Sequence, residues 1–223
     1  MVQLPFNDRD EAGRMLADHL AFHKTASQAT VLALPRGGVP VGFAIAKQLR
    51  MPLDVLIVRK LGVPWQPELA MGAIAGGVRV LDEQIVSQLD ISSPAIDLIA
   101  EQEEAEIRRR EALYRRGRGP LELAGRSVIL VDDGLATGST MCAAARCVAR
   151  LNPARVIVAV PVGSREACAR LLREADDLVC LATPEPFVAV GRWYRNFGQT
   201  SDAEVESLLA QNSHDRQALD HAA

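Results

Sequence analysis

Short, nearly continuous apolar runs alternate along this 223-residue chain with segments of helical periodicity. Apolar runs of this kind are typical of strands buried on both faces, and strand–helix alternation predicts a parallel sheet covered by helices. The predicted strands are residues 30–34, 53–58, 127–131, 156–160 and 178–181. The predicted helices are residues 8–24, 41–49, 94–118, 140–151 and 165–175. The fold class is therefore α/β, with a central parallel sheet flanked by helices.

Two further segments qualify this pattern. Residues 62–67 form a loop rich in Gly and Pro, and residues 71–81 alternate around Gly76-Gly77, which predicts a hairpin. With no internal repeat and no convincing linker, residues 1–223 are expected to form a single domain. The polar tail, residues 212–223, is expected to be frayed.

Composition excludes several classes of protein. The chain has 25 Lys and Arg against 28 Asp and Glu, a formal net charge of −3, which disfavours a dedicated nucleic-acid binder. No apolar run is long enough to cross a bilayer, and the first residues lack the layout of a signal peptide. The four cysteines have no C-x-x-C spacing and are read as free thiols of a cytoplasmic protein.

The predicted helix 94–118 carries acids in its first half and arginines in its second. This order complements the helix dipole and allows Glu–Arg pairs one turn apart. A solvated helix is the favoured interpretation, and a nucleic-acid patch is the alternative. The arginines concerned are Arg108, Arg109, Arg110, Arg115, Arg116 and Arg118.

The most specific stretch of the chain is residues 128–140, where the apolar strand 127–131 leads into Asp132-Asp133-Gly134-Leu135-Ala136-Thr137-Gly138-Ser139-Thr140. Ligands of α/β proteins bind at the carboxyl ends of the strands, where this loop lies. Backbone N–H groups at the start of the following helix form an anion site, to which the hydroxyls of the loop add donors. Two carboxylates beside a phosphate cradle suit the hydroxyls of a sugar, with a divalent cation nearby. No Walker A or Rossmann glycine pattern is present.

These nine residues resemble the PRPP-binding motif of the type I phosphoribosyltransferases. The resemblance implies the fold of that family and assigns Asp132 and Asp133 to the ribose hydroxyls of PRPP. It assigns the 5′-phosphate to the loop residues Ala136, Thr137, Gly138, Ser139 and Thr140.

Two basic segments are similar to further parts of the family's site. Arg36, Gly37 and Gly38 resemble the pyrophosphate loop, which requires exposed backbone N–H groups and a cation. Arg59 and Lys60 resemble the cations that precede the mobile catalytic loop of adenine phosphoribosyltransferases. Ordinary turns are the alternative in both places. Together with Asp132 and Asp133, these three cations are the candidate catalytic residues.

The resemblance also implies Mg²⁺ as a cofactor, held mainly through PRPP and water, with Asp132 and Asp133 as candidate ligands. Glu68 is a candidate contact for the metal or the acceptor, with a solvated loop residue as the equal alternative. Displacement of pyrophosphate then depends on positioning and electrostatics, and no Ser-His-Asp or Cys-His arrangement is found.

In the family that the sequence resembles, a hood outside the sheet recognises the acceptor. The resemblance assigns this hood to residues 5–25 and 184–210. Its candidate contacts are Phe187, Val188, Trp193 and Tyr194, whose aromatic rings either stack on a base or pack the C-terminal segment onto the core.

Nearly all of residues 6–206 resemble uncharacterised bacterial phosphoribosyltransferase-like proteins. This resemblance predicts transfer of a phosphoribosyl group to a nitrogenous base or amine with release of pyrophosphate, in nucleotide metabolism and salvage. A regulator that senses PRPP or nucleotides and binds nucleic acid or a protein is one alternative. A hydrolase of PRPP or nucleotides is another. The family is often dimeric, so a homodimer is compatible with the resemblance.

Overall fold

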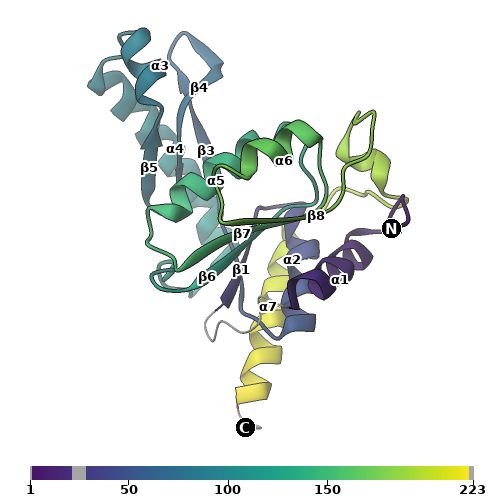
Figure 1. Cartoon of the computed structure of the whole chain (residues 1–223). Helices are drawn as coiled ribbons and strands as arrows, with labels where there is room; N and C mark the ends of the chain where they lie inside the picture. The colour runs from purple at the N-terminus through teal and green to yellow at the C-terminus, as the bar shows by residue number, and fades with distance from the viewer. Residues whose placement is uncertain (1, 22–28, 221–223) are drawn as a thin grey trace.

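A five-stranded parallel sheet forms the centre of the protein in the computed structural model, which describes residues 2–21 and 29–220 (Figure 1). The strand order is β2-β1-β6-β7-β8, and every neighbouring pair is parallel, which confirms the predicted central sheet. Its strands are β1 (Ala29–Ala33), β2 (Leu53–Val55), β6 (Ser127–Val131), β7 (Arg155–Val162) and β8 (Asp177–Ala182).

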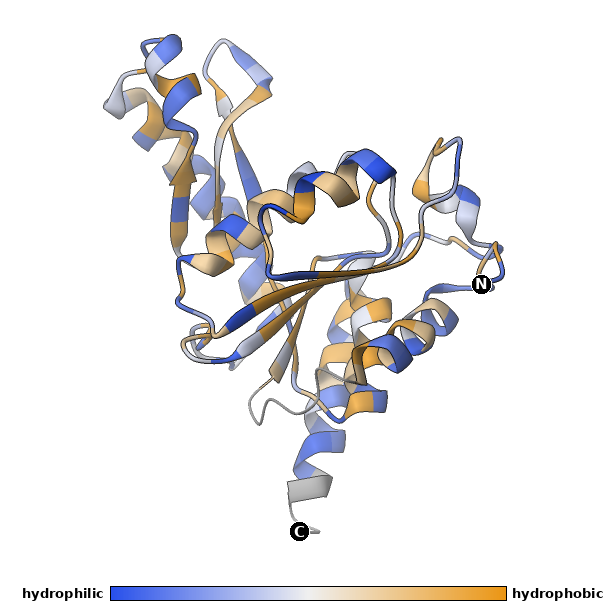
Figure 2. Cartoon of the chain, viewed as in Figure 1, coloured by the Kyte–Doolittle hydropathy of each residue, from blue (hydrophilic) through white to orange (hydrophobic). Residues whose placement is uncertain are grey.

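Both faces of this sheet are covered, as its apolar strands require. Along β6, Ile129 and Val131 belong to one buried cluster, whereas Val128 and Leu130 belong to the other. Helices α5 (Ser139–Ala149) and α6 (Arg165–Leu171) lie on one side, and α1 (Arg9–Leu20), α2 (Gly38–Leu49) and α7 (Asp202–Asp220) on the other (Figure 1). Figure 2 shows the hydrophobic residues concentrated on the strands and on the helix faces turned toward them.

The predicted strand 53–58 is wrong in extent, because the chain leaves the central sheet after β2. Leu56 and Ile57 are buried at the bend, so the apolar run continues through it and hides the break from hydropathy. A second, antiparallel sheet follows, in the order β3-β4-β5, with β3 (Val58–Val63), β4 (Gln66–Ala75) and β5 (Val78–Leu81). Arg59 and Lys60 therefore lie inside β3. The predicted loop 62–67 is also wrong in extent, because Gly62 and Val63 end β3, Gln66 and Pro67 begin β4, and only residues 64–65 connect the two strands.

The predicted hairpin 71–81 is confirmed as the pair β4–β5. Gly76 and Gly77 join these strands with φ angles of 57° and 77°, the left-handed region that glycine enters without steric cost. Helices α3 (Glu83–Gln88) and α4 (Ser93–Tyr114) follow, and only α4 was predicted. Figure 1 shows this second sheet projecting from the body of the molecule beside α3 and α4.

The expectation of a frayed tail after Asn212 is wrong as far as Asp220, because α7 continues to that residue. The Asn212 side chain is buried, accepts a bond from the Leu53 N–H at 2.9 Å and donates to the Met51 carbonyl at 3.2 Å. A polar residue read as a sign of fraying is thus the anchor of the helix. Residues 221–223 lie outside the described residues.

The hood is smaller than residues 5–25 and 184–210 together. Helix α1 packs against α2 beneath the sheet, so only the segment before and at its start reaches the site. There Phe6 pairs with Tyr194, next to the short helix η2 (Val190–Trp193). The ends of the predicted helix 8–24 and of the range 5–25 fall on residues 22–28, outside the described part of the chain.

Candidate functional site

Residues 132–138 connect β6 to α5, as the sequence predicts, and Ser139 and Thr140 already belong to the first turn of that helix. Gly138 is the N-cap residue of α5 with a φ of 71°, and the Thr137 hydroxyl accepts a bond from the Ser139 N–H at 3.4 Å. The Thr137 and Ser139 hydroxyl oxygens lie 3.0 Å apart, and the Ser164 hydroxyl donates to the Ala136 carbonyl at 2.8 Å. The Ser164 bond holds the loop from behind, while Thr137 and Thr140 are exposed at the start of α5, which is the arrangement of an anion site.

The two adjacent carboxylates have different environments. Arg9 donates from Nε and Nη2 to one Asp133 oxygen, at 2.9 and 2.8 Å, and both side chains are largely buried. Burial raises the pKa of Asp133, and the Arg9 guanidinium opposes that rise. Asp133 is therefore a carboxylate whose charge is compensated from within the protein.

Arg9 is itself held by the C-terminal segment. Its guanidinium lies 4.0 Å from the centroid of the Phe197 ring and donates to the Gly198 carbonyl at 2.8 Å. The Tyr194 hydroxyl donates to the Asp133 backbone carbonyl at 2.6 Å. The sequence analysis missed Arg9 as a site residue, although a buried pair of carboxylates signals the need for a cation.

Asp132 forms no ion pair with an arginine in the described part of the chain, and it lines a cavity of about 240 Å³ with Thr140 of the phosphate loop. Leu34 and Pro35, from the end of β1, form another wall of this cavity. Burial raises the pKa of Asp132, and the Asp133 carboxylate raises it further. Asp132 is thus the member of the pair that faces open space next to the anion site.

The loop after β1 packs directly against both carboxylates. A Cβ on Gly37 would lie 2.1 Å from an Asp133 carboxylate oxygen, and one on Gly38 would lie 2.6 Å from the Val131 carbonyl oxygen. The Pro35–Arg36 peptide bond is cis. Glycine is required here because the backbone approaches the end of β6 too closely for any side chain.

The structure does not bring the three predicted cations together. Lys60 donates to the Ser139 hydroxyl of the phosphate loop at 2.8 Å, whereas Arg59 pairs with Glu103 of α4 at 2.5 Å. Successive side chains of a strand point to opposite faces, so Arg59 and Lys60 cannot both face the loop from β3. Arg36 pairs instead with Asp202 at the start of α7, at 3.6 Å.

Helix α4 contributes a residue that the sequence analysis placed only on a solvated face. Arg110 lines the cavity next to Asp132 and pairs with Glu106 at 2.7 Å. Arg108 and Arg109 pair with acids of the same helix, and Arg115 pairs with Asp54. These internal pairs favour the solvated helix over the nucleic-acid patch. Hydropathy could not single out Arg110, because its neighbours in sequence are arginines as well.

Comparison with known proteins agrees with this geometry. Residues 9–194 match the family model "Phosphoribosyl transferase domain". The crystal structure of TT1426 from Thermus thermophilus has 41% sequence identity and a TM-score of 0.85, covering 93% of this chain and 99% of that one. The chain belongs to the phosphoribosyltransferase family.

A curated protein of Mycobacterium tuberculosis (strain ATCC 25618 / H37Rv) is named "Putative phosphoribosyl transferase Rv0571c". It is 52% identical over 206 residues, which are 92% of this phosphoribosyltransferase chain and 46% of that protein. The chain thus spans about half the length of the curated relatives it matches. A Neisseria gonorrhoeae protein crystallised with bound ppGpp shares the fold alone, with 13% identity, a TM-score of 0.50 and coverage of 95% of this chain and 99% of that one.

The predicted acceptor residues divide into two groups. Tyr194 is buried against Phe6 and Phe197, so its ring has no free face here and takes the packing role that was the alternative. Phe187 and Trp193 are half-buried with their ring centroids 6.4 Å apart, and Val188 is exposed. Those three lie on the segment around η2, where an acceptor site was expected.

The residues present fit a magnesium ion held largely by substrate. Within residues 2–21 and 29–220 no group of three or more His, Cys, Asp or Glu side chains could hold a metal. Asp132 is the carboxylate next to open space, and Mg²⁺ in proteins is bound by one or two carboxylates together with substrate phosphates and water. Glu68, the other predicted contact for the metal or the acceptor, is exposed on β4.

Two other sequence expectations concern the whole chain. All four cysteines are free thiols, as expected. No helix in the described part of the chain is long and apolar enough to cross a membrane.

Proposed function

We propose that this chain binds PRPP with Mg²⁺ and transfers its phosphoribosyl group to a nitrogenous base or amine, releasing pyrophosphate. The observation that carries the proposal is the β6–α5 loop, where Asp132 and Thr140 line one cavity beside an exposed anion site. A sugar bearing phosphates at both ends requires hydroxyl-binding carboxylates between two anion sites. The loop after β1, which lies against Asp132 and Asp133, supplies the second of these sites.

Each group then has a distinct task. The backbone N–H groups at the start of α5, with Thr137, Ser139 and Thr140, bind the 5′-phosphate. Asp132 accepts hydrogen bonds from a ribose hydroxyl, and Asp133, fixed by Arg9, completes the cradle. The N–H groups of Gly37 and Gly38 bind the pyrophosphate.

The transition state carries positive charge on the ribose ring and additional negative charge on the departing pyrophosphate. The Asp132 and Asp133 carboxylates stabilise the first of these, and cations at the pyrophosphate loop stabilise the second. Bound Mg²⁺ would supply further neutralisation of the pyrophosphate oxygens, with Asp132 as the protein carboxylate within reach.

Three arginines would contribute to the pyrophosphate subsite in different ways. Arg110 lines the cavity already. Arg36 and Arg59 are held by Asp202 and Glu103, and each must leave its acid before it can bind a polyanion. Lys60 already contacts the phosphate loop through the Ser139 hydroxyl. Closure of the β3–β4 hairpin over this loop would therefore place the Lys60 ammonium against the bound substrate.

The test is a panel of bases and amines incubated with PRPP, Mg²⁺ and the full chain, following pyrophosphate release and the coupled product. We expect one class of acceptor to give both products and Asp132→Asn to lower the rate by at least about 100-fold. Glu83→Gln, which neutralises an exposed carboxylate on α3, is the matched control and should retain activity.

Other outcomes identify the alternatives. Pyrophosphate release without any acceptor would mark a hydrolase. Calorimetric binding of PRPP without turnover would mark a regulator. A chain that neither binds PRPP nor releases pyrophosphate would overturn the proposal.

A further inference from the structure

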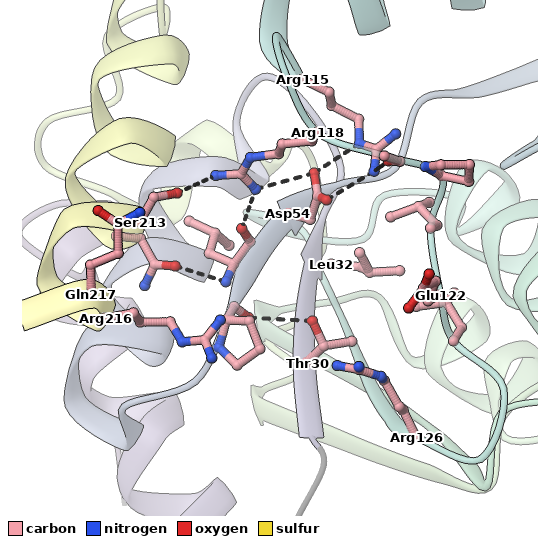
Figure 3. Close-up of a pocket in the computed structure, with 17 residues that line it drawn as sticks. Thr30, Leu32, Asp54, Arg115, Arg118, Glu122, Arg126, Ser213, Arg216 and Gln217 are labelled. Carbon is pink, nitrogen blue, oxygen red and sulfur yellow. Dashed lines mark hydrogen bonds and ion pairs between the residues drawn. The ribbon is translucent and has the colours of Figure 1, made fainter. Parts of the chain in front are cut away.

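A second cavity of about 500 Å³ lies at the amino ends of strands β1 and β2 of the central sheet (Figure 3). It is lined by Thr30 at the start of β1 and by Leu53 at the start of β2, whereas the phosphate loop follows the carboxyl end of β6. Since β1, β2 and β6 are parallel, the two cavities open at opposite ends of the strands. The volume is in the range of cavities that bind small molecules.

The inner wall of this cavity is a satisfied polar network. Arg115 donates to the two Asp54 oxygens at 3.0 and 3.1 Å, and its side chain is only 9% exposed. Arg118 donates to the Leu53 carbonyl at 2.7 Å and to the Ser213 hydroxyl at 2.7 Å, and lies 3.5 Å from Asp54. The only carboxylate on this wall is therefore already neutralised.

Two more arginines reach the cavity without an acid to bind. Figure 3 shows the side chains of Arg126, before β6, and Arg216, on α7, projecting from opposite sides toward Thr30. Neither forms an ion pair with a carboxylate among the side chains that the structure describes, those of residues 2–21 and 29–217. Glu122 is the remaining acid of the lining, so the cavity has an excess of two positive charges in a chain whose net charge is −3.

We propose that this cavity is a second ligand site, which binds a phosphorylated small molecule of nucleotide size. Guanidinium groups bind phosphate oxygens through paired, charge-assisted hydrogen bonds, and two of them facing one another suit a polyanion better than a single carboxylate. The network of Arg115, Arg118 and Asp54 keeps the wall in place, so the site exists before the ligand arrives. The proposal does not depend on the transferase activity.

The experiment separates this site from the phosphate loop by blocking the loop. Thr140→Glu places a carboxylate in the first turn of α5, where it repels phosphate. In that variant we expect calorimetry to show saturable binding of ADP or of inorganic pyrophosphate at a single site. Arg126→Gln/Arg216→Gln should weaken that binding by about tenfold or more.

Two control variants show whether a change in affinity comes from charge at this cavity. Arg150→Gln/Arg173→Gln removes the same charge from exposed positions elsewhere and should leave the affinity unchanged. Glu122→Gln removes the unpaired acid of the lining and should tighten binding by about threefold.

The proposal is overturned if neither probe binds saturably at concentrations up to about 1 mM. It is also overturned if the two double variants bind equally. Thermal melting of each variant without ligand shows that the protein is folded, so loss of binding is not loss of structure.

Discussion

Arg9 stabilises the fold and the site through a single carboxylate. It lies 124 positions before Asp133 in sequence, and both side chains are largely buried, so removing the cation leaves an uncompensated charge inside the protein. We expect Arg9→Gln to lower the free energy of unfolding by about 2 kcal/mol in urea titrations. Arg14→Gln, which breaks an exposed pair with Asp10, should change it by less than about 0.5 kcal/mol. Equal effects would contradict a special role for Arg9.

The raised pKa of Asp132 predicts how the free energy of unfolding depends on pH. Burial and the neighbouring Asp133 raise the pKa of Asp132, so the folded protein holds this proton more tightly than the unfolded chain does. Above about pH 4, where an unperturbed carboxyl ionises, this group therefore makes stability fall as the pH rises, until the folded pKa is passed. Asp132→Asn should flatten the decline in free energy of unfolding between about pH 4 and 7, and Glu68→Gln should not. Parallel curves for wild type and Asp132→Asn would contradict the raised pKa.

At the scale of elements, the loop after β1 and the end of β6 form one unit. A methyl group on Gly37 would lie 2.1 Å from an Asp133 oxygen and would displace that carboxylate. Gly37→Ala should weaken PRPP binding by at least about tenfold in calorimetry. Gly119→Ala is the control, because a Cβ there meets no atom within 4 Å. Unchanged affinity in Gly37→Ala would show that the contact has no bearing on the ligand.

The elements also show where sequence reasoning succeeded. The strand of residues 127–131 was predicted with its bounds. The loop after it and the hairpin around Gly76-Gly77 were predicted in kind and place but not in their bounds, and all three have a strong local pattern. Arg59 and Lys60 were placed at the end of one strand and lie inside another, since a buried bend reads like a buried strand. Which acid holds Arg36 or Arg59 depends on α4 and α7, which are distant in sequence, and no local pattern contains that information.

At the scale of the whole molecule, α7 links the loop after β1 to the amino end of β2. Its first residue, Asp202, accepts a hydrogen bond from the Tyr114 hydroxyl and forms an ion pair with Arg36. Ten residues later, the Asn212 side chain accepts a hydrogen bond from the Leu53 N–H at the start of β2. Asn212→Ala leaves the Leu53 N–H and the Met51 carbonyl without partners and should lower the free energy of unfolding by about 2 kcal/mol. Gln211→Ala, at an exposed position next to it, should have little effect in the same urea titration. A stable Asn212→Ala protein would assign the anchoring of α7 to its other contacts, among them the buried Val205 and Leu209 and the bond between Tyr114 and Asp202.

Around Asp133, hydrogen bonds join the residues near Phe6 and Arg9 to those from Tyr194 to Gly198. During synthesis on the ribosome, the phosphate loop is made long before Gly198 emerges, and until then Arg9 lacks the carbonyl and the aromatic ring that hold it. The site is therefore completed only when translation of the domain is nearly finished. A nascent chain that stalls before this point would carry the recognisable loop without a competent site.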